Sequence, residues 1–389
     1  MALLHLPIET ITEAQLGDLI QAKAAESLHI EYKRQTYGGG DGAHREFLAD
    51  VSSFANARGG DLLIGVEAAK GVPSALSAFA GNADAELLRL DNMARGGLEP
   101  RISNLQMRAV PIAAGGSVLV IRIPRSYRGP HRVIFGGSNK FHARSSIGKY
   151  EPNVDELRAM FAFAPELAER MRAFRFSRVA SIAAGDTPAA LQGNLCLVLH
   201  VVPFSHFDLR PSLSLPKAVG VGSYFIPIGT THAADSRINI DGFLTLSNPN
   251  DTGQHRAYVQ VFRPGAVEAV ACLGEHVEIR ALGVDIVRHA RLYTTALQEC
   301  DAEPPFMVMA SILGTKDKRV AALDNYKQLR GQVADRDQLH LTEVVLEETP
   351  NGNPNCGLAL KPLLDHLANA AGLATSPSFD QEGNCLIHE

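Results

Sequence analysis

Two glutamates five residues apart, with a lysine beside the second, are the residues of this sequence best suited to chemistry. Glu26, Glu31 and Lys33 lie in the stretch AAESLHIEYKRQ, residues 24–35. Apolar and polar residues alternate there, so a strand would turn Glu31 and Lys33 to the same side. A third acid, Glu67, ends the stretch DLLIGVE, residues 61–67, which predicts a short buried strand.

Three carboxylates gathered on neighbouring strands repel one another unless a cation neutralises them. Mg²⁺ or Mn²⁺ prefers such oxygen ligands, bridges phosphate oxygens and polarises a phosphoryl group. Lys33 would then lie where the charge on a scissile phosphate grows. The spacing alone favours a simpler interpretation, in which Glu31 and Lys33 form a surface ion pair and Glu26 ends a helix.

The net charge of −5 is unevenly distributed along the chain. Residues 117–150 contain no Asp or Glu, and four aromatic residues, Tyr127, Phe135, Phe141 and Tyr150, lie among their cations. Unpaired cations neutralise phosphates, and aromatic rings stack on bases, so this stretch predicts nucleic-acid binding over an ordinary solvated face. The cations of the stretch are Arg122, Arg125, Arg128, Arg132, Lys140, Arg144 and Lys149, of which the first six are the predicted nucleic-acid ligands.

Length and composition predict a soluble protein of two or three domains. The chain has 389 residues, 46% of them apolar and 20% charged. It contains no apolar run of membrane-spanning length, and its N-terminus does not resemble a signal peptide. Its five cysteines are scattered without a C-x-x-C pair, which argues against a disulfide framework or a zinc knuckle. A cytoplasmic location is the default expectation.

Periodicity and capping residues predict an α+β protein with helices flanking a mixed sheet in its first part. Thr12 and Gln15 form a capping-box pattern, Gly59–Gly60 follow a helical stretch, and Asn153 is a candidate N-cap. The segment 263–266 is expected to turn a hairpin in a second α+β part. Strands are predicted at 28–34, 101–110, 118–124, 132–135 and 140–144, and later helices at 283–300, 318–335 and 358–371. The predicted domains are residues 1–163 and 190–389, joined by a helical connector at 164–189.

Residues 20–162 resemble the Schlafen AlbA-type domain, also called the divergent AAA-4 region. The blocks ESLHIEYK, FLADVSSFANARGGDLLIGVE, VIRIPRS and KFHARSS occur in the family's order. The resemblance implies an α/β nucleic-acid-binding fold and, in nuclease members, a metal-dependent RNA-cleaving site of three carboxylates. Here these positions hold Glu26, Glu31 and Glu67, although the third is usually Asp. Animal Schlafen nucleases have two such lobes, and a homodimer would supply the second one here.

The favoured hypothesis is therefore a metal-dependent endoribonuclease that cleaves tRNA or another structured RNA. Its C-terminal domain would sense a protein or ligand trigger. A role in bacterial anti-phage defence is suggested only by analogy with defence effectors of similar architecture. The alternative is a non-catalytic regulator that binds DNA or RNA. ATP binding is a weak third option, because the chain lacks a Walker A motif. The glycines of GGGDGAHREF, before a helix N-terminus, are expected to form a flexible loop rather than a phosphate site, and Asp50 is expected to be solvated or capping.

Overall fold

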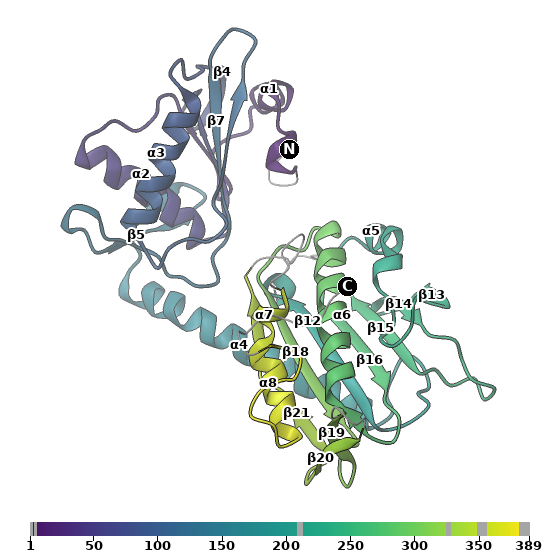
Figure 1. The fold of residues 1–389 in the computed structure, drawn as a ribbon. Helices are drawn as coiled ribbons and strands as arrows, with labels where there is room; N and C mark the ends of the chain where they lie inside the picture. Colours follow the sequence, from purple (N-terminus) through teal and green to yellow (C-terminus); the bar gives the residue numbers. More distant parts are fainter. Residues whose placement is uncertain (1–2, 4–5, 208–212, 324–327, 348–355, 381–389) are drawn as a thin grey trace. The chain divides into compact units, whose positions relative to one another are not determined.

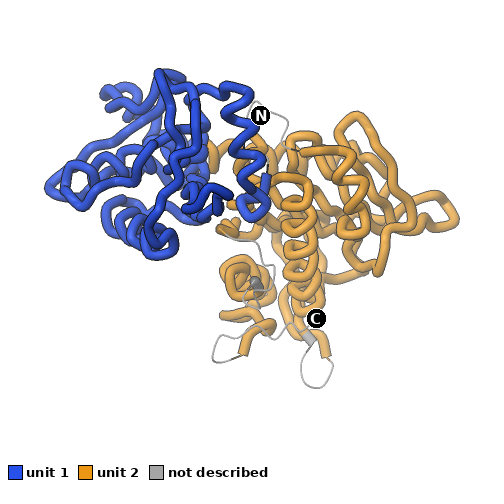
Figure 2. Tube along the Cα trace, turned by 90° about the horizontal axis from the view of Figure 1, so that it is seen from above, with its two compact units in different colours: residues 1–166 blue, residues 167–389 orange. Residues whose placement is uncertain are grey.

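The computed structural model describes residues 3, 6–207, 213–323, 328–347 and 356–380. The chain divides into two compact units, residues 1–166 and 167–389, which Figure 2 colours blue and orange. The boundary falls inside one continuous helix, α4 (Val154–Ala183). Helices combined with mixed and antiparallel sheets confirm the predicted α+β class. Throughout the described ranges, every helix is too short or too polar to cross a bilayer.

A four-stranded sheet forms the centre of the N-terminal unit, in the order β1-β2-β7-β6. β1 runs parallel to β2, and the other neighbours are antiparallel. The alternation predicted for the first strand is confirmed, because Ile30 and Tyr32 are buried while Glu31 and Lys33 are only half-buried. The strands are β1 (Ile30–Lys33), β2 (Gly60–Ile64), β6 (Gln106–Pro111) and β7 (Ser117–Ile123).

Helices cover both faces of this sheet (Figure 1). Alternate residues of β2 contact the two cores. Leu62 and Ile64 pack with α2 (Asp41–Ala55) and α3 (Ala83–Gly97), whereas Leu63 packs on the side of α1 (Glu13–Gln21). Such two-sided burial explains why Leu62, Leu63 and Ile64 of β2 are apolar on both faces. The capping box predicted at Thr12 and Gln15 is formed before α1. Asn153 is the N-cap of α4 as predicted, and it exchanges hydrogen bonds with Glu156.

Glycines set two turns that position the candidate site. Gly59 has φ +70° in the turn that follows the end of α2, and a Cβ there would lie 2.7 Å from the backbone nitrogen of Arg125. Gly65 has φ +100° and separates β2 from β3, so the predicted strand 61–67 is two strands. The short strands of this unit are β3 (Val66–Ala69), β4 (Val72–Leu76), β5 (Leu98–Glu99), β8 (Arg132–Val133), β9 (Lys140–Phe141), β10 (Ala143–Ser145) and β11 (Gly148–Tyr150).

The C-terminal unit is built on an eight-stranded antiparallel sheet, β13-β14-β15-β16-β12-β18-β21, with β22 also paired to β18. The predicted hairpin across residues 263–266 is confirmed between β15 and β16. The strands are β12 (Cys196–Pro203), β13 (Asp235–Ile238), β14 (Gly242–Leu246), β15 (Ala257–Phe262), β16 (Val267–Cys272), β18 (Phe306–Leu313), β21 (Gln338–His340) and β22 (Val344–Leu346).

The two faces of this sheet bury different residues. Leu197, Leu199 and Val201 of β12 share one core with α6, and Val198 shares the opposite core with Val179 of α4. Cys196 and Cys272 lie opposite each other on β12 and β16 as free thiols, with sulfur atoms 3.4 Å apart. The helices are α5 (Leu215–Gly220), α6 (Ile279–Glu299), α7 (Cys356–Ala359) and α8 (Lys361–Ala370).

The helix predicted over 318–335 is wrong. The described residues of this segment form β19 (Arg319–Leu323) and β20 (Leu329–Val333), which join β17 (Val277–Glu278) in a small sheet. Val320 and Ala321 are fully buried where β19 pairs with β17. Burial against a strand distant in sequence therefore overrides the local helical pattern, as tertiary context routinely does.

Candidate nucleic-acid interface

Six charged side chains from four elements meet beside β1, and we call them the ion-pair cluster. The Lys33 ammonium lies 3.2 Å from Glu31 Oε1, so these two residues share one side of the strand as predicted. The same ammonium lies 3.3 Å from Glu46 Oε1 and 3.4 Å from Asp50 Oδ2. The cluster draws on β1, α2, β10 and β11 and consists of Glu31, Lys33, Glu46, Asp50, Arg144 and Lys149.

Arg144 is a buried cation of this cluster. Only 1% of its side chain is exposed, it pairs with Glu31, and its Nε donates to the Ser27 carbonyl at 3.1 Å. Its guanidinium lies 4.0 Å from the centroid of the Phe54 ring. These contacts hold Arg144 inside the unit, not on the surface where a nucleic-acid phosphate would approach.

The three predicted catalytic carboxylates lie in different surroundings. Glu26 accepts a hydrogen bond from the Tyr32 amide at 3.0 Å, and burial together with the nearby Glu31 charge raises the pKa of Glu26 above its usual range. Glu67 lies on β3, beyond the turn at Gly65, and its half-exposed carboxylate is 3.6 Å from the Arg34 guanidinium. The turn thus carries Glu67 out of the central sheet.

These carboxylates do not form a three-acid metal site in this arrangement. The two oxygens of Glu31 face different cations, Oε1 facing Lys33 and Oε2 facing Arg144. Across the described residues, no three His, Cys, Asp or Glu side chains are grouped so that they could hold a metal ion. The repulsion that would call for Mg²⁺ or Mn²⁺ is relieved at Glu31 by the protein's own cations.

Much of the basic stretch is neutralised by acids from elsewhere in the chain. Arg122 forms an ion pair with buried Asp61 at 2.8 Å and donates to the carbonyls of Leu3 and Leu6. Arg132 lies 2.6 Å from Glu99, and Lys140 lies 2.5 Å from Glu151. The absence of acids between residues 117 and 150 therefore does not make the folded surface there uniformly positive.

Arg125 lies against two aromatic rings. The Arg125 guanidinium lies 5.2 Å from the centroid of the Tyr127 ring and 4.8 Å from that of Phe163. The two rings stack on each other with centroids 6.1 Å apart, and all three side chains are half-buried. Arg128 is exposed nearby in the chain. A guanidinium stacked on aromatic rings is a type of surface on which nucleic-acid bases stack.

Comparison with known proteins identifies the family of this unit. The family model described as Schlafen, AlbA_2 matches residues 26–153. Those residues form a Schlafen AlbA_2 domain. The match confirms the resemblance seen in the sequence and supports a nucleic-acid-related function.

Among the solved structures that resemble part of the chain are two with low sequence identity, and no curated protein matches the chain. One is the N-terminal domain of a RecG-related protein from Nitrosomonas europaea, 21% identical, covering 37% of this chain and 94% of that one, with a TM-score of 0.28. The other is the DIP2311 protein from Corynebacterium diphtheriae, 15% identical, covering 39% of this chain and 32% of that one, with a TM-score of 0.28. These low TM-scores do not establish a fold shared over the whole chain.

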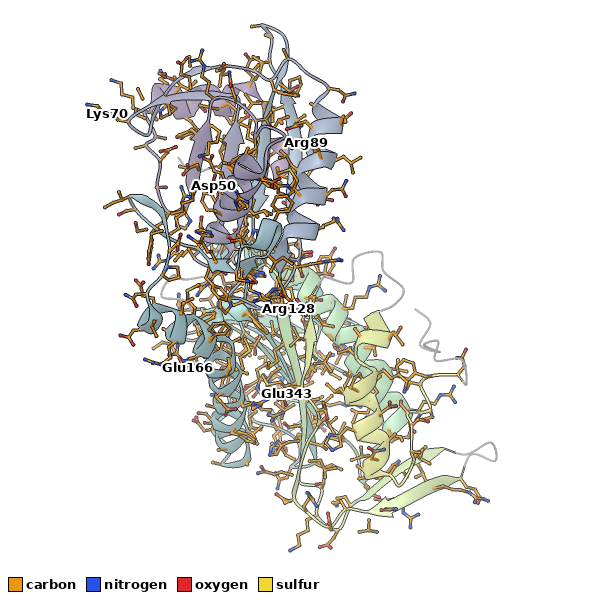
Figure 3. All side chains as sticks on the ribbon, turned by 90° about the vertical axis from the view of Figure 1, so that its left-hand side faces the viewer. Asp50, Lys70, Arg89, Arg128, Glu166 and Glu343 are labelled. Atoms are coloured by element: carbon orange, nitrogen blue, oxygen red, sulfur yellow. The ribbon has the colours of Figure 1, made fainter. Side chains whose placement is uncertain are left out.

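Within the AlbA_2 domain, Asp50 is the cluster residue whose role sequence reasoning missed. Asp50, which Figure 3 labels, is fully buried, not solvated or capping as expected. It accepts hydrogen bonds from the Tyr37 hydroxyl and the Lys149 ammonium, each at 2.7 Å. Asp50 lies three residues after Phe47 and four residues before Phe54, and this helical spacing already places it on the apolar face of α2. An acid on such a face needs partners, because a buried unpaired charge is very costly.

The cluster keeps Lys33 charged. Burial disfavours its ammonium form, but the surrounding Asp50, Glu31 and Glu46 carboxylates outweigh burial and raise the pKa of Lys33. Burial and the Asp50 charge likewise raise the pKa of the Tyr37 phenol, which stays a neutral donor. The cluster thus brings together three basic and three acidic side chains.

Proposed function

We propose that this chain is a nucleic-acid-binding protein that uses its AlbA_2 domain as a binding module without needing a metal. The observation that supports binding most directly is the stack of Arg125 on Tyr127 and Phe163, with exposed Arg128 close by in sequence. Unpaired bases stack on such rings, while the guanidinium groups contact phosphates. We infer that RNA with unpaired segments, such as the loops of a tRNA-like molecule, is the preferred ligand, and DNA is the alternative.

Substitutions in the stack separate stacking from charge. Tyr127→Ala is expected to weaken binding of a single-stranded RNA about fivefold or more, because base–aromatic stacking contributes about 1–3 kcal/mol per base. It should leave the salt dependence unchanged. Arg125→Ala should weaken binding and also reduce the slope of log affinity against log salt by about 0.7. Fluorescence anisotropy over a salt series measures both quantities.

The matched control is Arg95→Ala, which removes an exposed arginine from α3 of the same unit. It is expected to change neither the stacking contribution nor the salt slope appreciably. If Tyr127→Ala and Arg125→Ala both bind RNA as tightly as the control, the nucleic-acid surface lies elsewhere in the protein.

An endoribonuclease is the second candidate, and one observation favours it. Glu26 and Glu31 are close enough for the Glu31 charge to raise the pKa of Glu26, as two carboxylates at a shared site would do. Use of Mg²⁺ or Mn²⁺ would require Glu31 to leave Arg144 or Lys33. Four further expectations stay predictions: tRNA cleavage, a role in anti-phage defence, homodimer formation, and sensing of a trigger by the C-terminal unit.

Incubation of labelled tRNA with the protein distinguishes the two candidates. For a binding module, the RNA is expected to stay intact in Mg²⁺ or Mn²⁺ as well as in EDTA, and Glu31→Gln should leave its affinity equal or higher, because a negative charge is removed. Gel analysis of the RNA beside a binding titration in EDTA measures both. If the wild type cleaves the RNA only with a metal ion present, and Glu31→Gln abolishes this cleavage, the protein is an endoribonuclease and the binding-module proposal is wrong.

A further inference from the structure

A pocket of about 480 Å³ lies in the AlbA_2 domain next to the ion-pair cluster. It forms between residues 42–49 of α2 and the segment 133–151, and it shares Glu46 and Lys149 with the cluster. The side chain of Asn56 anchors this segment, because it accepts from the His131 amide at 2.7 Å and donates to the His131 and His142 carbonyls at 2.9 Å. These hydrogen bonds fix the backbone of the segment that forms one side of the pocket.

Its cations differ in how firmly they are already paired. Arg45 is exposed and has no ion-pair or hydrogen-bond partner within the described part of the chain. Lys140 is paired with Glu151, but both side chains are more than half exposed, and such surface pairs contribute little. Lys149 is held by buried Asp50 at 2.7 Å and retains further N–H groups, since an ammonium has three. Arg45 and Lys140 are thus available to an incoming anion.

The remaining lining favours an anion over a cation. Glu46 directs Oε1 toward Lys33 at 3.3 Å, and burial lowers the pKa of His142, so His142 is neutral at pH 7. Gly136, at φ +60°, lets the loop backbone lie against Arg45, because a Cβ there would come within 2.8 Å of the guanidinium. The lining contains three cations and two carboxylates, and the exposed Glu151 is free to turn into solvent.

We propose that this pocket binds a phosphate group, with Arg45 and Lys149 as its constant ligands and Lys140 joining them once Glu151 turns away. The inference deepens the proposed function and rests on it for the source of the phosphate. That source is the end of an RNA strand, an internal phosphate of the strand, or a free nucleotide. A guanidinium and two ammonium groups provide charge-assisted hydrogen bonds to the several oxygens of a phosphate.

The experiment uses the full chain and three probes at fixed salt. They are a 5′-phosphorylated RNA oligonucleotide, the same RNA with a 5′-hydroxyl, and adenosine 5′-monophosphate. Arg45→Ala is expected to weaken binding of the phosphate-bearing probe roughly tenfold, the effect of losing charge-assisted hydrogen bonds. Glu151→Gln is expected to strengthen it, because the competitor for Lys140 loses its charge. Arg95 lies outside the pocket, so Arg95→Ala should leave the affinity for every probe unchanged.

Each probe identifies a different source. Loss of the preference for 5′-phosphorylated RNA in Arg45→Ala identifies a strand end, and equal weakening of both RNAs identifies an internal phosphate. If RNA binds but neither Arg45→Ala nor Glu151→Gln changes any affinity, the pocket inference fails while the proposed function stands. If no RNA binds, the proposed function fails. Adenosine 5′-monophosphate then tests the pocket by itself. If the nucleotide binds and Arg45→Ala weakens its binding, the pocket inference is supported. If the nucleotide does not bind, the pocket inference is overturned.

Discussion

Replacement of Glu268 by Ala is expected to destabilise the C-terminal unit by about 3–5 kcal/mol, the loss typical when one partner of a buried ion pair is removed. The Glu268 carboxylate on β16 is fully buried. It accepts hydrogen bonds from Arg178 at 2.8 and 3.0 Å, from the Tyr258 hydroxyl at 2.9 Å, and it lies 3.2 Å from His200 Nε2. The substitution leaves these donors without their acceptor.

Hydrogen exchange of the β12 and β16 amides measures this effect, because it reports on the C-terminal unit separately in a chain of two units. The matched control is Glu275→Ala, an exposed glutamate in the same unit, for which a change within about 0.5 kcal/mol is expected. Equal protection of these amides in the two variants would contradict the structural role assigned to Glu268.

The same carboxylate predicts how acid affects this unit. Burial raises the pKa of Glu268, but hydrogen bonds from His200 and Arg178 outweigh burial and lower the pKa to about 2. In the unfolded chain a Glu has a pKa of about 4.3. The stabilisation is therefore fully present above this unfolded value and is lost as the pH falls toward 2. Glu268→Gln, which cannot ionise, should remove this part of the acid dependence.

Replacement of Asp50 by Ala is expected to destabilise the AlbA_2 domain by about 3–5 kcal/mol, because it removes the buried acceptor of the Tyr37 hydroxyl and the buried carboxylate that pairs with two half-buried ammonium groups. Tyr37, Lys33 and Lys149 all direct polar atoms at this fully buried carboxylate. Exchange protection of the β2 and β7 amides measures the loss. Asp18→Ala, at an exposed position on α1, is the matched control and should change protection little.

Asp50→Asn separates the fold from the binding function. The amide keeps an oxygen that can accept from Tyr37 but removes the negative charge that restrains Lys33 and Lys149. RNA affinity is therefore expected to rise, with a steeper salt dependence, while the domain stays folded. If a folded Asp50→Asn protein shows the same RNA affinity and the same salt dependence as the wild type, neither Lys33 nor Lys149 comes near a phosphate.

Local pattern and turn chemistry determined much of this protein from its sequence. Alternation in residues 28–34 predicted β1 and the shared side of Glu31 and Lys33, and helical spacing predicted the buried face of α2. The capping box at Thr12, the N-cap at Asn153 and the hairpin at 263–266 also formed as predicted. The blocks of the AlbA_2 domain were recognisable for the same reason, since each is a contiguous stretch. These features depend on neighbours within a few residues, which a sequence displays directly.

Only the tertiary structure decided which charges meet. Asp61 and Glu99 lie far in sequence from the cations that they neutralise, Arg122 and Arg132, so a window of residues 117–150 contained no sign of either acid. Gly65 turned Glu67 away from the central sheet by one positive φ angle within a run that reads as a single strand. Cys196 and Cys272, 76 residues apart, became neighbours only through strand pairing. Ion pairs, turns out of a sheet and cross-strand contacts depend on how distant segments pack, and local periodicity contains no information about that packing.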